Sequence, residues 1–135
     1  MRIVLDTNVV VSGLLSAFGP PAQIVDLVSS GDVRLVVDER ILEEYRDVLT
    51  RPQFRLDAWD LDAFLSMLDA SEHVIGAPLP FALSDPDDEP FLEIAIAGAV
   101  DALVTGNEKH FKTPRGRLTR PIMTPRHFLD LFSGR

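Results

Sequence analysis

The chain contains no cysteine, and this absence removes several kinds of site at once. Disulfide scaffolds, thiolate metal sites and cysteine nucleophiles are all excluded. A metal site must therefore use oxygen ligands or the three histidines. No apolar run approaches the ~20 residues of a membrane span, and the first residues lack the basic region and apolar stretch of a signal peptide. We therefore expect a soluble, cytoplasmic protein with no membrane partner.

Internal repeats, low-complexity tracts and linkers are also absent from the sequence. The 135 residues are 46% hydrophobic, which is enough to build one core. We expect a single domain that spans residues 1–135.

Basic residues are scarce except near the C-terminus. Residues 1–108 carry six Lys or Arg against twenty Asp or Glu, a net charge of −14, whereas residues 109–135 carry seven against one, a net charge of +6. A basic strip beside an acidic body is suited to contact phosphate, although it could equally dock an acidic partner or simply be solvated. The candidate RNA-binding residues are Lys109, Lys112, Arg115, Arg117 and Arg120.

Short apolar runs alternate with helical segments along the chain. The pattern predicts strands at residues 2–6, 33–37, 102–105 and 121–123. It predicts helices at residues 20–30, from 38 to about 49, within 60–72, at 91–99 and from 125 onward. Strands separated by helices pair in parallel with right-handed crossovers. The expected fold class is therefore α/β, a three-layer α/β/α sandwich with a central parallel sheet.

Asp6 follows the first apolar run and precedes the polar Thr7 and Asn8. In open α/β sheets, ligands gather where the strands end. The same position also suits an aspartate that caps a helix or closes a turn. Asp6 is therefore a candidate site residue, with Thr7 and Asn8 as supporting neighbours, and its role depends on partners further along the chain.

Two adjacent glutamates lie on the helix expected after Asp38, and helical geometry separates them. Glu44 lies three residues after Ile41 and four before Val48, at the margin of the apolar stripe. Glu43 lies on the opposite side and is expected to face water. Glu44 is therefore either at the edge of the core or directed into a cleft.

The segment SDPDDEP places four acidic residues just before a strongly apolar helix. Capping and the helix dipole explain one or two of them. Asp88 is in phase with the apolar positions of that helix, so its side chain is expected to point inward, whereas Glu89 and Glu93 mark the solvent side. Asp87 is a weaker candidate, and Asp85 is a supporting residue.

A further polar group follows the strand expected at residues 102–105. Thr105 ends this strand, and Gly106 permits a sharp turn that would bring the Asn107 carboxamide to the edge of the sheet where the first strand ends. The Gly-Asn pair is equally a plain turn signal. His110 is expected to be a loop or packing residue rather than a ligand.

Together, Asp6, Glu44, Asp88 and Asn107 would form a cluster of oxygen donors. Carboxylates packed this closely repel one another and take up protons unless a cation holds them. Oxygen donors suit a hard divalent ion such as Mg²⁺ or Mn²⁺. Such an ion generates hydroxide and neutralises charge on a phosphate under attack. The cluster therefore predicts metal-assisted hydrolysis of a phosphodiester.

The sequence resembles PIN-domain proteins, specifically toxins of the VapC-like kind. The matching segments are LDTNVVVSGLL, ERILEEYRDVLTRPQF, DPDDEPFLEIAIAGAVDALVTGN with HF just after it, and PIMTPRHFLDL. These segments extend over nearly the whole chain in the expected order. The resemblance implies a compact PIN fold, an Mg²⁺- or Mn²⁺-dependent ribonuclease that acts on RNA, a cognate antitoxin that occludes the site, and a homodimer.

The resemblance also assigns residues. By position, the acidic residues of the family fall on Asp6, Glu44 and Asp88, which become the expected metal ligands. The fourth acidic position falls on Asn107, where this sequence departs from the quartet. An amide can still coordinate a metal or orient water, but it brings no charge. The missing charge argues against a second tightly bound metal ion more than it argues against activity.

Other enzyme classes fit less well. A phosphatase of the haloacid dehalogenase type needs a second aspartate where this chain has Asn8. A receiver domain needs an acidic pair and a late lysine that are not placed correctly here. The alternative that stays open is a catalytically idle PIN-like module that binds RNA or a protein partner.

Overall fold

The computed structural model describes residues 1–112 and 121–134, and in these residues five strands form one sheet. The strand order is β3-β2-β1-β4-β5, and every neighbouring pair is parallel. The first strand of the chain therefore lies at the centre of the sheet. The strands are β1 (Arg2–Leu5), β2 (Arg34–Val37), β3 (Glu72–His73), β4 (Ala102–Val104) and β5 (Ile122–Met123).

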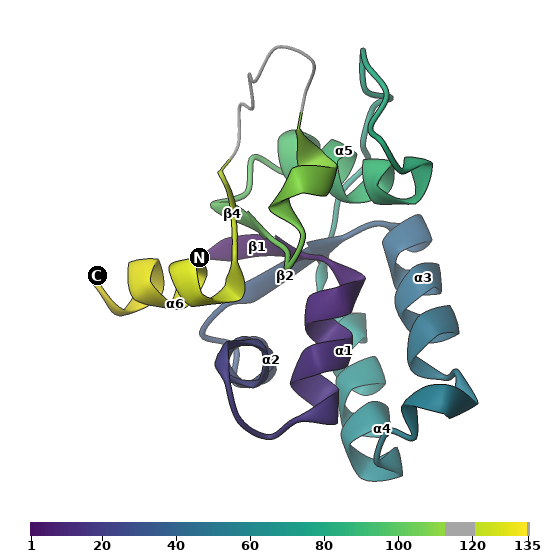
Figure 1. Ribbon diagram of the computed structural model, residues 1–135, viewed down its shortest axis with the longest axis vertical. Helices are drawn as coiled ribbons and strands as arrows, with labels where there is room; N and C mark the ends of the chain where they lie inside the picture. Colours follow the sequence, from purple (N-terminus) through teal and green to yellow (C-terminus); the bar gives the residue numbers. More distant parts are fainter. Residues whose placement is uncertain (113–120, 135) are drawn as a thin grey trace.

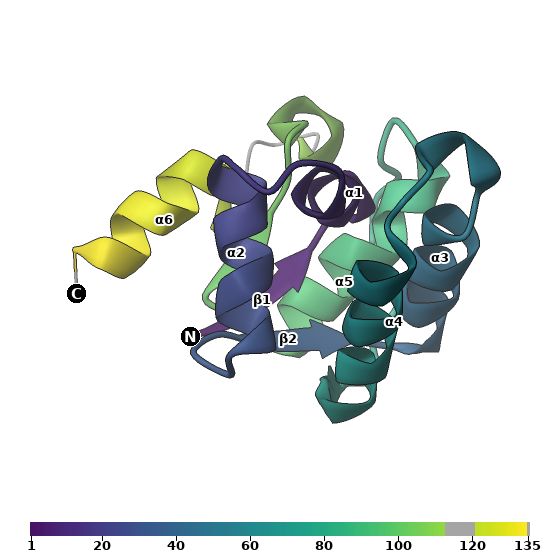
Figure 2. The ribbon, with the colours of Figure 1, turned by 90° about the horizontal axis from the view of Figure 1, so that it is seen from below.

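Helices cover both faces of this sheet. In Figure 1, α5 lies above the strands, whereas α1, α2 and α4 lie below them, as the view from below in Figure 2 also shows. This arrangement confirms the predicted α/β/α sandwich with a parallel sheet. The helices are α1 (Thr7–Leu15), α2 (Pro20–Ser29), α3 (Glu39–Leu49), α4 (Ala58–Met67), α5 (Glu89–Ala97) and α6 (Pro125–Ser133).

No single helix in the described part of the chain is both long and apolar enough to cross a membrane. Helices α1 and α2 meet that test of length and composition only as a pair, and the pair is bent by 98°. Both helices contribute buried side chains to the core, among them Val9 and Ile24.

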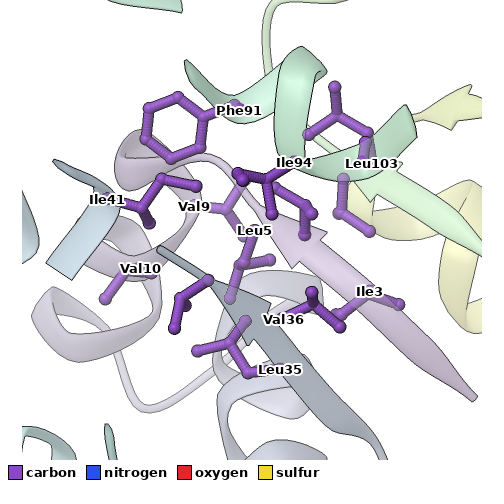
Figure 3. Packing of buried hydrophobic residues seen from close by; sticks show 14 of the residues in the cluster. Ile3, Leu5, Val9, Val10, Leu35, Val36, Ile41, Phe91, Ile94 and Leu103 are labelled. Atoms are coloured by element: carbon purple, nitrogen blue, oxygen red, sulfur yellow. The ribbon is translucent and has the colours of Figure 1, made fainter. Parts of the chain in front are cut away.

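The core lies on both faces of the central strands. Ile3, Val4 and Leu5 of β1 are completely buried, as are Leu103 and Val104 of β4. A parallel strand covered by helices on both faces reads as a continuous apolar run, which explains the sequence pattern at these positions. Figure 3 shows these strands packed between side chains of α1 on one side and of α5 on the other.

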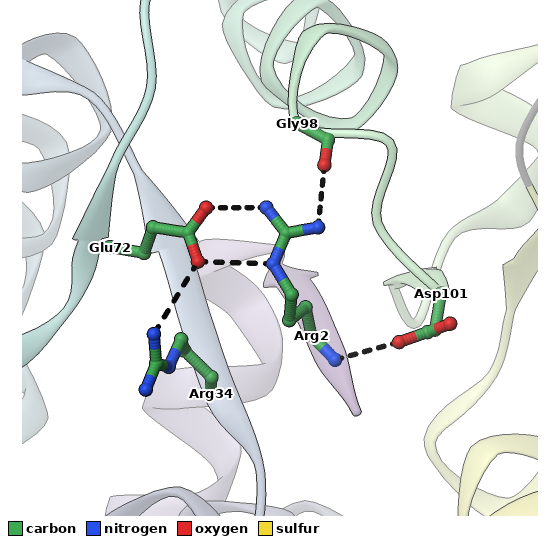
Figure 4. Close-up of polar contacts among 5 residues, drawn as sticks. All are labelled: Arg2, Arg34, Glu72, Gly98 and Asp101. Atoms are coloured by element: carbon green, nitrogen blue, oxygen red, sulfur yellow. Dashed lines mark hydrogen bonds and ion pairs between the residues drawn. The ribbon is translucent and has the colours of Figure 1, made fainter.

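A polar network closes the amino-terminal edge of the sheet (Figure 4). Arg2 Nε donates to Glu72 Oε1 at 3.0 Å, and Arg2 Nη1 donates to the Gly98 carbonyl at 2.7 Å. The Arg2 backbone N–H donates to Asp101 Oδ2 at 2.8 Å. Glu72 begins β3, the two-residue strand at one side of the sheet. These contacts therefore connect this outermost strand to the central strand β1. The network lies at the opposite edge from the polar residues that follow β1 and β4.

Several elements differ from the expectations. Helix α1 and strand β3 are additional, and the segment expected at residues 60–72 divides into α4, a 3₁₀ turn at Leu68–Ala70 and β3. Glu93, expected on the solvent side of α5, is only 11% exposed, because it pairs with Arg40 of α3 at 2.8 Å. That expectation was wrong, and the exposed side of α5 carries Ile96 and Ala97 instead.

Candidate functional site

Asp6 lies where β1 ends and α1 begins. It occupies the N-cap position of α1, yet its side chain makes no capping hydrogen bond there. Asp6 Oδ2 accepts a hydrogen bond of 2.7 Å from the Thr105 hydroxyl. Asp6 is nearly buried, with 7% of the residue exposed. Burial raises the pKa of this carboxyl, and the Thr105 hydroxyl opposes the shift. The backbone N–H groups of Thr7 and Asn8 also lower the pKa, so Asp6 lies at the start of the helix as a cap would and in addition contacts the residue that follows β4.

Thr105 links the ends of two strands. It is completely buried after β4, donates to Asp6, and accepts a hydrogen bond of 3.0 Å from the backbone N–H of Asn107. Asn8 supports the same turn, since its Oδ1 accepts from the Gly106 N–H at 3.5 Å. Asn107 itself is exposed, and its side chain makes no hydrogen bond with the described residues. The turn thus places Asn107 at the expected edge of the sheet.

Glu44 reaches this edge from the middle of α3. The predicted phase of α3 is confirmed, because Ile41 and Tyr45 are fully buried, Glu43 is exposed and Glu44 is half-buried. The buried hydroxyl of Thr7 donates to Glu44 Oε2. Burial raises the pKa of Glu44, and the charges of Asp6 and Asp87 raise it further. Asp6 and Glu44 are therefore held by hydroxyl groups and lie near enough to feel one another's charge.

Asp88 completes the acidic group from the start of α5. It ends a 3₁₀ turn, Pro86–Asp88, and its side chain is only 14% exposed. Burial raises its pKa to about 6, and the charges of Asp6 and Asp85 add to the shift. Its buried Oδ2 makes no hydrogen bond, and His110 Nδ1 lies 3.3 Å away. Asp88 therefore points inward as its helical phase predicts.

The two other aspartates of this segment lie differently. Asp85 caps the 3₁₀ turn, since its Oδ1 accepts from the Asp87 N–H at 2.9 Å. Asp87 is exposed and acts on Glu44 only through its charge.

The three inward carboxylates are charged groups in a crowded, partly buried place. Each of Asp6, Glu44 and Asp88 has a raised pKa, with burial as the first cause. Their oxygens are the donors that a hard cation prefers, and neither carboxylate oxygen of Asp88 makes a hydrogen bond with the described residues. Among the described residues, however, no group of three Asp, Glu or His side chains is arranged to hold one metal ion. The chemistry of the donors fits a divalent cation, which would have to draw them closer.

Two residues near the site were not predicted to have a part in it. Tyr45 falls in the apolar stripe of α3, and its buried hydroxyl donates to the carbonyl of Leu5, directly before Asp6. His110 lies on the 3₁₀ turn Glu108–Phe111 and faces Asp88. No local pattern reveals either contact, because both join segments more than 20 residues apart.

The basic strip is only partly described. Lys109 and Lys112 are exposed, next to the turn that carries Asn107. The other three candidate RNA-binding residues, Arg115, Arg117 and Arg120, lie outside the described residues.

Comparison with known proteins adds one match. A family model described as a PIN domain matches residues 2–109, a range that contains all four candidate catalytic positions. No curated protein and no solved structure matches the chain.

Proposed function

This chain belongs to the PIN-domain family, whose members are generally nucleases, and we propose that it is a metal-dependent endoribonuclease. The observation that carries the proposal is the set of Asp6, Glu44 and Asp88 at one edge of the sheet, each with a raised pKa. Burying three like charges destabilises the fold, so their presence together indicates a functional site. A divalent cation would relieve that cost.

We assign the roles as follows. Asp6, Glu44 and Asp88 would hold Mg²⁺ or Mn²⁺, which when bound supplies an activated water and neutralises charge on the phosphate. Thr105 and Thr7 orient the carboxylates by donating to Asp6 and Glu44. Asn107 offers an uncharged amide at the rim of the site.

The proposed substrate is single-stranded RNA, approached along the basic strip. Lys109 and Lys112 offset the repulsion between the phosphates and the acidic group by bringing positive charge beside it. Arg115, Arg117 and Arg120 would extend this strip.

The test is cleavage of end-labelled single-stranded RNA with and without divalent metal. We expect cleavage with Mg²⁺ or Mn²⁺ that leaves a 5′-phosphate and a 3′-hydroxyl, and none in excess EDTA. Asp6→Asn, Glu44→Gln and Asp88→Asn should each abolish it with the circular dichroism spectrum unchanged. The matched control is Glu43→Gln, one residue from Glu44 but exposed, which should keep full activity. Undiminished cleavage in EDTA would rule out the metal mechanism.

A second candidate is the idle binding module. Two observations favour it: the uncharged Asn107 at the fourth position, and the lack of a ready three-residue metal group in the described residues. On this alternative, the protein would bind RNA with and without metal and cleave it in neither case. The same assay therefore separates the two candidates.

We further propose that the enzyme acts in the cytoplasm as the toxin of a toxin-antitoxin pair and forms a homodimer. The support is the resemblance of its sequence segments to VapC-like toxins. Induced expression should arrest growth, the Asp6→Asn variant should not, and co-expression of the neighbouring gene should restore growth. Equal arrest by both forms would show that toxicity does not come from this site.

A further inference from the structure

The two oxygens of Asp88 have different surroundings. Oδ2 is buried without a hydrogen bond, and its nearest basic atom is His110 Nδ1 at 3.3 Å. Oδ1 does not share this isolation, because Oδ2 is the only buried side-chain nitrogen or oxygen without a partner in the described residues. Oδ1 also makes no hydrogen bond with those residues, and it is not among their buried atoms without a partner.

His110 is held in place through its backbone. Its N–H donates to the Asn107 carbonyl at 3.0 Å, and the Asn107 N–H donates to Thr105, which in turn donates to Asp6. Phe111, the next residue, is completely buried and anchors the turn. The imidazole is 48% exposed, so its contact with Asp88 is not forced by core packing. The backbone of His110 is thus held beside the acidic group, and its ring lies next to Asp88 Oδ2 and near enough to Asp6 for its charge to act there.

We propose that His110 is a positioning residue: when the metal is bound, its Nδ1–H donates to Asp88 Oδ2 and leaves the other carboxylate oxygen for the metal. The inference rests on the proposed function, since it concerns the metal-binding state of the same site. It requires the histidine tautomer with the proton on Nδ1. Partners that fix the orientation of a metal ligand typically change metal affinity by about 10- to 100-fold.

The opposite interpretation is that His110 merely supplies positive charge where the metal will go. His110 would then compete with the cation, and its removal would tighten metal binding. The buried position of Oδ2 favours positioning, because a cation arriving from solvent meets Oδ1 first. The two interpretations predict opposite signs for one measurement.

The experiment is a titration of the full chain with Mn²⁺ by calorimetry, without RNA. His110→Ala should weaken Mn²⁺ binding about 10-fold or more. His110→Asn should restore most of the affinity, because its amide nitrogen lies near the place of Nδ1. His110→Gln should not, because its amide nitrogen lies near the place of Nε2. Melting curves of the two amide variants guard against a folding defect in the alanine variant.

The matched control is His73→Ala. His73 is also 48% exposed and also lies beside a carboxylate, with Nδ1 at 3.8 Å from Glu39 Oε1. Its removal should leave Mn²⁺ affinity unchanged. Unchanged or tighter binding by His110→Ala, or equal rescue by Asn and Gln, would overturn the inference while metal-dependent cleavage by the wild type upheld the proposed function. A wild type that binds no Mn²⁺ would overturn both.

Discussion

Asp88 shows how much a single residue can cost the metal-free fold. Its pKa rises from an ordinary value of 3.8 to about 6 because of burial and of the charges on Asp6, Asp85 and Glu44. A shift of this size corresponds to at most about 3 kcal/mol, and solvent screening reduces it to about 1–2 kcal/mol. The folded protein therefore binds this proton more tightly than the unfolded chain does, and the cost is present above pH 6 and disappears toward pH 4.

We predict that Asp88→Asn stabilises the metal-free protein at pH 7.5 by about 1–2 kcal/mol. The gain should shrink as the pH falls through 6 and vanish near pH 4, where the wild-type carboxyl is protonated in both states. Urea denaturation in EDTA across this pH range measures it. The exposed neighbour Asp87→Asn should change stability by less than about 0.5 kcal/mol at every pH. A loss of stability at pH 7.5 would contradict the prediction.

The residues that sequence could place are those governed by local periodicity. Glu44 and Asp88 point inward because the apolar stripes of α3 and α5 fix their phase. Glu93 fails the same argument, because a partner on another helix, Arg40, allows a glutamate to be nearly buried. His110 could not be placed by phase, since its contact depends on how two loops meet.

At the scale of elements, the packing of α1 on α2 is decided at Gly13. A Cβ at this position would lie 2.6 Å from Val25 Cγ2 and 2.8 Å from the Pro21 carbonyl oxygen. Alanine would gain about 1 kcal/mol of helix propensity, but overpacking costs about 1–3 kcal/mol. The backbone carbonyl cannot rotate away, so the two helices would have to separate.

We predict that Gly13→Ala lowers the free energy of unfolding by about 1–2 kcal/mol, because a clash with backbone takes the upper part of the overpacking cost and exceeds the propensity gain. Gly106→Ala is the matched control, because its Cβ would meet only Asn8 atoms at 3.7–3.9 Å and its φ is not positive. It should change stability by no more than about 0.5 kcal/mol. The turn after β4 is present as expected, and its backbone at Gly106 has no positive φ that would require glycine. Equal losses of stability in urea denaturation would contradict this account.

Elements with a clear period could be predicted to within a few residues, as β2, α2 and α3 show. Helix α1 could not, because three consecutive β-branched residues, Val9 to Val11, favour a strand over a helix. Strand β3 has only two residues, too few for any alternation. The fold class follows from the longer elements, and the edge of the sheet depends on tertiary contacts such as Arg2 with Glu72.

At the scale of the whole molecule, charge is divided between an acidic body and a basic C-terminal fifth. We predict that replacing Lys109, Lys112, Arg115, Arg117 and Arg120 with glutamine weakens RNA binding. The slope of the logarithm of the binding constant against the logarithm of the salt concentration should become shallower. We expect a change of about 0.7 for each phosphate that the variant no longer neutralises. The rate on saturating RNA should change much less, because these side chains position substrate.

Binding titrations at several salt concentrations check this prediction. The control replaces exposed arginines of the acidic body, Arg46 and Arg55, and should leave the slope unchanged. If the strip only docks an acidic antitoxin tail, the five-residue variant would keep its RNA slope and bind the antitoxin more weakly instead.

Because β1 lies at the centre of the sheet, it can pair with both of its neighbours only after β4 has been synthesised. Asp6 is synthesised about a hundred residues before its neighbour β4 and its partner Thr105. Until those residues follow, the nascent chain can hold no assembled acidic group. While it is still beside ribosomal RNA, the growing polypeptide therefore lacks the geometry that the proposed cleavage would require.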